Sequence, residues 1–299
     1  MKVLVDFSQT VISSVVVHSK DLKSGDDAKD LIKHIILNQL LGLKKRFGGE
    51  LVICCDSKTY WRKEIFEHYK GHRKHTKNKG KDILDWALLY KTMDEIKVEL
   101  RDNFPYKILE VNRAEADDIF GTLVNYYQTN ELITNGLIEE PNTVVLVSTD
   151  CDFIQLLKYK NVKVWNNVKK SFISTKNPTH ALIEHICTGD TGDNLPNVVT
   201  PDSWAADRSN NISTRANPFP SSRLSDFFEK GYSACKNETE QRNWKRNEVL
   251  IDLSKIPKEI NDAIIEQYIN HEVQGSKKRI FDYLQSKRMK LLLSSATDF

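Results

Sequence analysis

Four short apolar runs, each followed by acidic residues, constrain this chain more than any other feature of its sequence. The runs are rich in β-branched residues and have the length of strands that are buried on both faces of a sheet. Longer stretches with helical periodicity separate them, as in residues 28–43 and 83–100. This alternation predicts an α/β domain with a parallel sheet. The four runs are residues 3–5, 51–55, 107–111 and 144–147.

Acidic side chains stand at or soon after the end of each run. Asp6 ends the first run, and Asp56 follows the second. In a parallel sheet the strand C-termini lie along one edge, where ligands bind, so we expect these carboxylates to converge there. A further pair beside glycines is spaced three residues apart, which places both side chains on one face of a turn or helix start. The candidate residues are Asp6, Asp56, Glu115, Asp117, Asp118, Asp150, Asp152, Asp190 and Asp193.

Each of these acids has an ordinary structural explanation when it is taken alone, because Asp is a favoured N-cap and acids stabilise the first turn of a helix. Taken together, they would repel one another unless cations neutralised them. Hard oxygen ligands with no accompanying His or Cys select Mg²⁺, with Mn²⁺ as a substitute, over zinc. Two such ions about 4 Å apart can hold the attacking and leaving oxygens of a phosphoryl displacement. The pattern therefore predicts phosphodiester hydrolysis.

A basic segment with interspersed aromatic residues follows the second run. From Lys58 to Lys81 there are nine Lys or Arg residues and two Glu residues. A basic run is usually a solvated surface, but this one leaves the acidic edge and carries aromatic rings that could stack on bases. We expect the acids to hold metal ions while this segment binds phosphates.

Composition and cysteine usage narrow the class of protein. Hydrophobic residues make up 39% of the 299 residues and charged residues 28%, as in globular proteins, and no apolar run has the length of a membrane span. The N-terminus lacks the zones of a signal peptide, and the five cysteines form no Cys-x-x-Cys pair, so a reducing cytoplasm is expected. The net charge of +3 alone says little about partners.

The character of the sequence changes in its last third. Residues 200–222 are rich in Ser, Asn, Pro and Asp and are typical of irregular structure. Helical periodicity returns in residues 260–270 and 280–293. We therefore expect an α/β domain over residues 1–195 and a smaller, mostly helical C-terminal domain over residues 196–299.

These residues occur in the order of the motifs of the 5'-nucleases, the family of flap endonucleases and phage ribonuclease H enzymes, and the sequence resembles the phage enzymes most closely. The similarity extends over nearly the whole chain. It implies a 5' to 3' exonuclease and flap endonuclease that removes RNA primers and adjacent DNA from 5' ends during phage lagging-strand replication, in the host cytoplasm. The matching segments are residues 3–9, 60–63, 69–73, 115–118, 148–153, 189–194 and 247–257.

The resemblance also implies roles for individual residues. Lys70 and Arg73 match a cationic pair in a helical arch, at about residues 60–90, where they would steer the scissile phosphate and stabilise developing charge. Tyr69 would be available for stacking, and Arg62 and Lys74 would add nucleic-acid contacts. The expected catalytic residues are Lys70, Arg73, Asp117 and Asp152. The first metal ion would be surrounded by Asp6, Asp56, Glu115, Asp117 and Asp150. The second would be held by Asp152, Asp190 and Asp193. Asp118 would lie just outside both sets of ligands.

The implied partners are RNA/DNA hybrids and flap or nicked DNA duplexes. Between Asp193 and Lys230 the sequence contains no glycine, whereas the family's duplex-binding hairpin uses glycine turns. We therefore expect weak, salt-sensitive duplex binding that a single-strand DNA-binding protein or a sliding clamp assists. A monomer without membrane association is expected.

Three other functions are compatible with parts of the sequence pattern. A PIN-type nuclease that cuts single-stranded RNA would share the acidic edge but not the basic arch or the C-terminal helices. A non-catalytic DNA-binding scaffold of the same fold would not need the full set of acids. A magnesium phosphatase is disfavoured because the segment Asp6-Phe-Ser lacks the Asp-x-Asp of such nucleophile sites.

Overall fold

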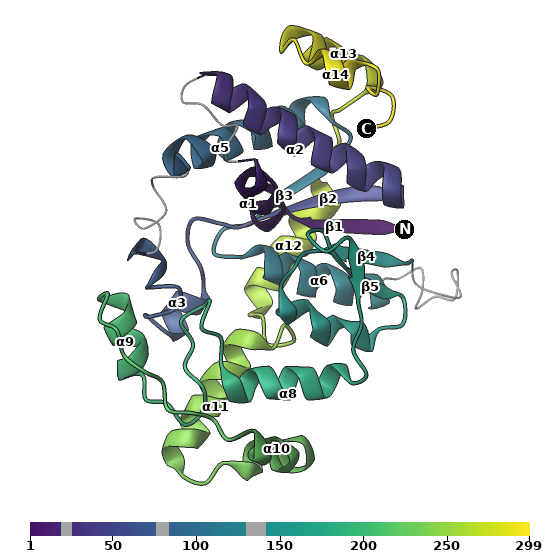
Figure 1. Ribbon diagram of the computed structural model, residues 1–299. Helices are drawn as coiled ribbons and strands as arrows, with labels where there is room; N and C mark the ends of the chain where they lie inside the picture. Colours follow the sequence, from purple (N-terminus) through teal and green to yellow (C-terminus); the bar gives the residue numbers. More distant parts are fainter. Residues whose placement is uncertain (19–25, 76–83, 130–141) are drawn as a thin grey trace.

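The computed structural model describes residues 1–18, 26–75, 84–129 and 142–299. At the centre of this part of the chain lies a six-stranded sheet with the order β3-β2-β1-β4-β5-β6 (Figure 1). All neighbouring pairs are parallel except β5 with β6. The strands are β1 (Lys2–Asp6), β2 (Glu50–Cys55), β3 (Lys107–Glu110), β4 (Val144–Val147), β5 (Val162–Asn166) and β6 (Ser171–Ile173).

The direction in which the chain adds strands reverses beside β1. The chain passes from β1 to β2 and β3 on one side, and then crosses back to β4 and β5 on the other. Such a reversal is a topological switch point, where a crevice forms outside the carboxyl ends of the strands. Because β1 pairs with both β2 and β4, the residues that follow these three strands are brought to the same place.

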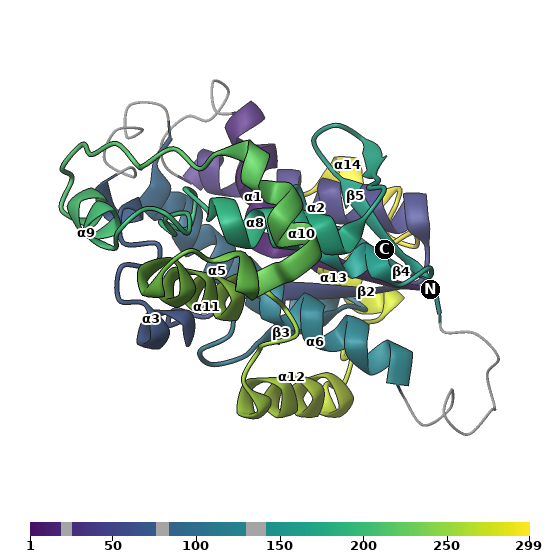
Figure 2. The ribbon, with the colours of Figure 1, turned by 90° about the horizontal axis from the view of Figure 1, so that it is seen from below.

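Helices cover both faces of the sheet. The described helical segments are α1 (Phe7–Val17), α2 (Asp26–Phe47), α3 (Arg62–Ile65), α5 (Trp86–Asn103), α6 (Ala116–Thr129), η2 (Cys151–Lys158), α8 (Pro178–Thr188), α9 (Ser203–Ser209), η3 (Ser221–Arg223), α10 (Leu224–Lys230), η4 (Gly231–Ala234), α11 (Glu238–Ile251), α12 (Lys258–Asn270), α13 (Lys277–Ser286) and α14 (Lys290–Leu293). Helices α1, α2 and α5 lie on one face and α6 and α12 on the other (Figure 1). Figure 2 shows α12 beside α6, against which it packs.

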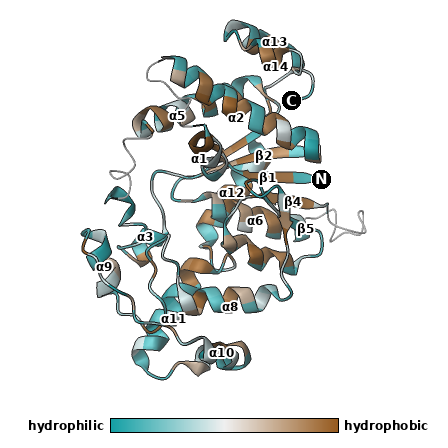
Figure 3. Ribbon diagram, in the orientation of Figure 1, coloured by the Kyte–Doolittle hydropathy of each residue, from teal (hydrophilic) through white to brown (hydrophobic). Residues whose placement is uncertain are grey.

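The alternation of side chains along the strands supplies two hydrophobic cores. Val3 and Val5 of β1 point into the core under α1, α2 and α5, whereas Leu4 between them points into the core under α6 and α12. The central strands β1, β2 and β4 are apolar over most of their length, as Figure 3 shows, because both faces of the sheet are covered there. A third core joins α8, α9, α10 and α11 to the start of the basic segment through Phe66 and Tyr69.

The four predicted strands and the parallel α/β sheet are confirmed. The strands β5 and β6 and the short helix α9 were missed, and α9 lies within the stretch expected to be irregular. Residues 280–293, predicted as one helix, form α13 and α14, because the chain turns at Arg288, whose φ is 55°. A left-handed residue cannot continue a right-handed helix, so the periodicity there spans two elements.

The helices after residue 196 pack against more than one part of the structure, and α9, α10 and α11 share the third core with α8. Helix α12 packs against α6, and α13 packs against α5.

Of the basic arch, residues 60–75 and 84–90 are described, whereas Lys77, Lys79 and Lys81 lie outside the described residues. Within the described ranges, no helix combines the length and apolar character that crossing a membrane would require.

Candidate active site

The acids that follow β1 and β2 are anchored by hydrogen bonds to the start of a helix. Asp6 is the N-cap of α1 and accepts from the Gln9 amide at 2.9 Å, and its other oxygen accepts from the Ser148 hydroxyl at 3.2 Å. Asp56 accepts from the Ala116 amide at 2.9 Å, which ties the end of β2 to the start of α6. These contacts fix the direction of both carboxylates.

The acids that follow β4 and α8 are held in the same way. Asp150 caps η2 by accepting from the amide of Asp152 at 3.1 Å. Asp190 accepts from the amides of Gly192 at 2.6 Å and Asp193 at 3.1 Å, which closes a tight turn. The turn requires Gly189, because its φ is 65° and an added Cβ would lie 2.5 Å from the Leu195 carbonyl oxygen.

Burial and neighbouring acids raise the pKa of three of these carboxylates, Asp6, Asp117 and Asp150. Burial and the charge of Asp56 raise the pKa of Asp6 to about 7. Desolvation by the surrounding protein, and then the charge of Asp152, raise the pKa of Asp150 to about 7. Part of the Asp150 side chain remains in contact with solvent. Desolvation and Asp150 raise the pKa of Asp117 well above its ordinary value. Helix capping explains the direction of single carboxylate oxygens. It does not explain why several acids raise one another's pKa at one edge of the sheet.

Two cations from the basic segment enter this cluster. The Lys70 ammonium group forms an ion pair with Glu115 and lies 3.6 Å from Asp193 Oδ1. Arg73 Nη2 lies 2.7 Å from the same Asp193 oxygen, and the Arg73 side chain is half exposed. Desolvation alone would lower the pKa of Lys70, but Asp193 and Glu115 raise it above the ordinary lysine value. Both cations therefore remain charged at the edge of the crevice.

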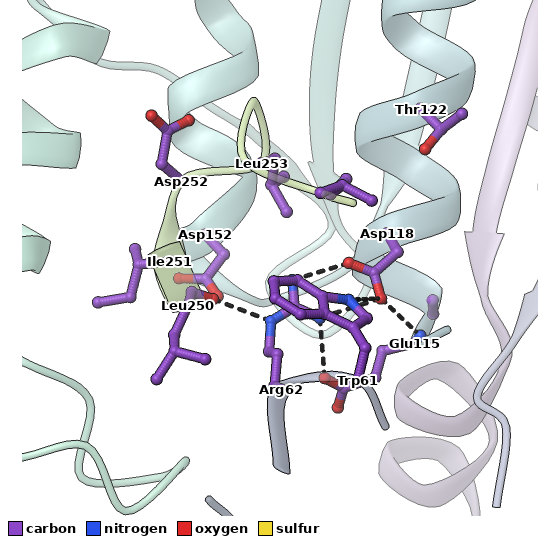
Figure 4. A network of polar contacts seen from close by, with 12 residues as sticks. Trp61, Arg62, Glu115, Asp118, Thr122, Asp152, Leu250, Ile251, Asp252 and Leu253 are labelled. Atoms are coloured by element: carbon purple, nitrogen blue, oxygen red, sulfur yellow. Dashed lines mark hydrogen bonds and ion pairs between the residues drawn. The ribbon is translucent and has the colours of Figure 1, made fainter. Parts of the chain in front are cut away.

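Arg62 and Asp118 form a buried ion pair behind the cluster (Figure 4). Arg62 Nη2 lies 2.8 Å from Asp118 Oδ1, its Nη1 lies 3.0 Å from Glu115 Oε2, and its Nε donates to the Leu250 carbonyl at 2.9 Å. Asp118 also accepts from the Trp61 indole at 3.1 Å. Arg62 is 3% exposed and Asp118 is fully buried.

These contacts enclose both side chains within the protein. Arg62, predicted to contact nucleic acid, instead has its guanidinium enclosed by protein groups. Asp118 was expected just outside the metal ions, and its oxygens contact Arg62, the Trp61 indole and the Glu115 amide. The two residues instead join the start of α3 to the start of α6 and so set the position of Glu115.

Tyr69, predicted to be available for stacking on a base, is instead buried. Its side chain is 1% exposed, and its hydroxyl lies 2.7 Å from Asp193 Oδ2 and 3.0 Å from Glu115 Oε2. A stacking platform needs an exposed ring face. Tyr69 thus links two acids of the cluster, whereas Lys74 remains on the surface.

His185 is a member of the site that the sequence did not identify. It stands in the last turn of α8, with Nδ1 at 2.8 Å from Asp152 Oδ1 and Nε2 at 3.5 Å from Asp190 Oδ2. Burial would lower the pKa of His185, but Asp152 and Asp190 raise it to about 11.

Comparison with known proteins places this geometry in a family. The model of the "5'-3' exonuclease, N-terminal resolvase-like domain" matches residues 3–184, which is more than half of the chain. The chain belongs to the 5'-3' exonuclease family. Residues 178–299 of the chain match the family model described as "T4 RNase H, C terminal".

Individual relatives agree with this placement. The chain is 26% identical over 308 aligned positions to the Ribonuclease H of Enterobacteria phage T4, covering 99% of this chain and 95% of the relative. Its fold is similar to that of the bacteriophage T5 flap endonuclease, solved with metal ions, with a TM-score of 0.63, 14% identity and coverage of 91% and 99% of the two chains. A complex of the T5 enzyme with DNA and metal ions has a TM-score of 0.61 at 15% identity, covering 90% and 97%.

Proposed function

We propose that this chain is a divalent-metal-dependent nuclease that cuts near free 5' ends, as exonuclease and flap endonuclease, and removes RNA primers and adjacent DNA during phage lagging-strand replication. The observation that carries the proposal is the cluster of mutually repelling carboxylates at the switch point of the sheet, faced by Lys70 and Arg73. Relatives named as Ribonuclease H and as a flap endonuclease bound to DNA support the choice of substrate.

The donor set of the cluster fits divalent cations. Most of its members are carboxylates, and neighbouring acids help to raise the pKa of Asp6, Asp117 and Asp150. Such oxygen donors suit Mg²⁺. When bound, two ions would supply charge to the attacking and leaving oxygens of a phosphodiester. We assign Asp6, Asp56, Glu115, Asp117 and Asp150 to the first ion and Asp152, Asp190 and Asp193 to the second.

The chain's own residues would bind and orient the substrate. Lys70 and Arg73 form ion pairs with Glu115 and Asp193. With metal ions held by these acids, both side chains would be free to contact a phosphate at the same edge of the sheet. Tyr69 and the pair of Arg62 with Asp118 hold Glu115 and Asp193 in place from behind.

Residues 1–195 would carry the chemistry, and residues 196–299 would bind duplex and partners. A single-strand DNA-binding protein or a sliding clamp is the kind of partner we propose, acting on a monomer. The exposed cations of α13, Lys277 and Lys278, are candidate contacts for such a partner or for duplex phosphates.

A panel of labelled substrates tests the proposal directly. The nuclease is expected to cut a 5'-flap duplex and a nicked RNA/DNA duplex in Mg²⁺, and to leave a hairpin with a blocked 5' end intact. Preferential cutting of unstructured single-stranded RNA would favour a PIN-type nuclease instead. Binding of every substrate without cutting any would favour a non-catalytic scaffold.

Replacing either cation at the crevice is expected to slow the chemical step. Lys70→Ala and Arg73→Ala should each lower the single-turnover cleavage rate at saturating enzyme by about tenfold or more, because charge stabilisation at the phosphate is lost. Lys74→Ala is the matched control: this exposed neighbour should weaken binding and leave the saturated rate unchanged. A saturated rate equal to wild type in both test variants would reduce Lys70 and Arg73 to surface charge.

Divalent cations are expected to stabilise the fold more at neutral than at acidic pH. The folded-state pKa values of Asp6 and Asp150 are raised from 3.8 to about 7, so between these values the folded protein holds more protons than the unfolded chain. Stability of the ion-free protein therefore falls as the pH rises from about 4 to 7. Mg²⁺ at a hundred times its Kd should restore about 2.7 kcal/mol at pH 7.5, and much less at pH 5, where protons compete for the carboxylates.

Thermal unfolding with Mg²⁺ and with NaCl of equal ionic strength measures this effect. Mg²⁺ should raise Tm by several degrees at pH 7.5 beyond the NaCl control. Equal shifts with the two salts, or a larger Mg²⁺ shift at pH 5, would contradict the assignment.

A further inference from the structure

His185 brings a nitrogen donor into a cluster that otherwise consists of carboxylates. Helix α8 packs against η2, and this contact places the imidazole between Asp152 at the start of η2 and Asp190 just after α8. Nδ1 faces Asp152 and Nε2 faces Asp190, at 2.8 and 3.5 Å. Both ring nitrogens are therefore directed at the acids.

The positions of these three side chains suit a single ion. One oxygen of Asp152, one nitrogen of His185 and one oxygen of Asp190 all lie within 4.8 Å of one another. Bonds of about 2.0–2.2 Å to a metal place neighbouring ligand atoms roughly 3 Å apart, so a small side-chain adjustment would complete the set. Among the described residues this is the group of three with that property.

The chemistry of the donor set selects a class of ion. Mg²⁺ prefers oxygen ligands and keeps several waters, whereas imidazole nitrogen suits transition metals such as Zn²⁺, and carboxylate oxygens also suit Mn²⁺. The ligands assigned to the first ion are all carboxylates, so the two sites would prefer different metal ions. A counter-cation role for His185 makes the opposite prediction, since a protonated ring would repel an incoming ion.

We propose that His185 is a metal ligand, completing with Asp152 and Asp190 a mixed nitrogen and oxygen site that binds Mn²⁺ in preference to Mg²⁺. The inference rests on the proposed function, because it assigns one more ligand to the second ion of that site. It makes His185 a determinant of metal selectivity.

Pulsed electron paramagnetic resonance of Mn²⁺ bound to the full chain tests the inference without any activity measurement. Wild type should show the ¹⁴N coupling of a directly bound imidazole, and His185→Gln should lose it. In titrations, His185→Gln should weaken Mn²⁺ binding at one site by about tenfold or more while Mg²⁺ affinity changes by less than about twofold. His180→Gln is the matched control, because His180 lies on the same helix with its ring stacked on Phe228.

Each result decides between the alternatives. Bound Mn²⁺ without nitrogen coupling in wild type, or tighter binding of both ions by His185→Gln, would overturn the ligand assignment and leave the proposed nuclease site standing. No Mn²⁺ bound by wild type would contradict the proposed function itself. If His185→Gln does not fold, the wild-type spectrum still decides, since His185 is the histidine of the metal-holding group in the described residues.

Discussion

Asp117→Asn is expected to lower the single-turnover cleavage rate by roughly a thousandfold or more while DNA binding is retained. Asp117 stands in the first turn of α6, and its pKa is raised by desolvation and then by Asp150, which places it among the other carboxylates. The amide keeps the shape of the side chain but removes a charge that holds a cation. It also reduces the repulsion of phosphates, so affinity for a 5'-flap duplex should not fall.

Asp152→Asn should behave in the same way, because Asp152 also belongs to the cluster. Asp226→Asn on α10 is the control, since that carboxylate is exposed and pairs only loosely with Lys230, at 3.6 Å. Binding measured by fluorescence anisotropy and cleavage measured on the same substrate separate the two steps. Wild-type cleavage by Asp117→Asn would refute the metal assignment.

Arg62→Met is expected to destabilise the fold by about 3–5 kcal/mol, because it leaves buried carboxylates without a partner charge. Arg62 contacts both Asp118 and Glu115, and all three side chains are at most 3% exposed. Methionine fills a similar volume, so the loss would come from the uncompensated charges rather than from a cavity. Denaturant unfolding of wild type and variant measures the difference.

Two further variants identify the cause. Arg113→Met removes an exposed ion pair with Glu64 and should cost no more than about 1 kcal/mol. The double variant Arg62→Met with Asp118→Leu should recover part of the lost stability, because one unpaired charge is removed with its partner. An Arg62→Met protein as stable as wild type would show that the pair is solvated in solution.

The sheet and the acidic cluster could be predicted because both follow from local patterns. Asp6, Asp56 and Asp150 stand at or soon after the ends of apolar runs, and a parallel sheet brings such positions to one edge. Helix capping, the ordinary explanation for a single acid, does not exclude a place in the cluster. Asp6 and Asp150 are both N-caps and members of the cluster.

The orientation of the basic segment could not be predicted, because it depends on contacts between residues far apart in sequence. Arg62 and Tyr69 belong to a basic, aromatic segment typical of nucleic-acid binding. Their side chains nevertheless point inward and contact Asp118 and Asp193. Lys70 turns toward the acids through a left-handed conformation, with φ of 55° and its amide bonded to the Asp193 carbonyl. His185 was missed for a similar reason, since only the packing of α8 on η2 brings it to Asp152.

Cleavage of a 5'-flap duplex labelled at its 5' end, with Mg²⁺, EDTA and readdition of Mg²⁺, tests the metal-dependent 5'-nuclease assignment most directly. Wild type is expected to release short 5'-labelled products with Mg²⁺, none with EDTA, and the same products once Mg²⁺ is in excess, while Asp117→Asn releases none under any condition. Product release that persists in EDTA, or that Asp117→Asn supports at the wild-type rate, would contradict a metal-dependent nuclease centre at the carboxylate cluster.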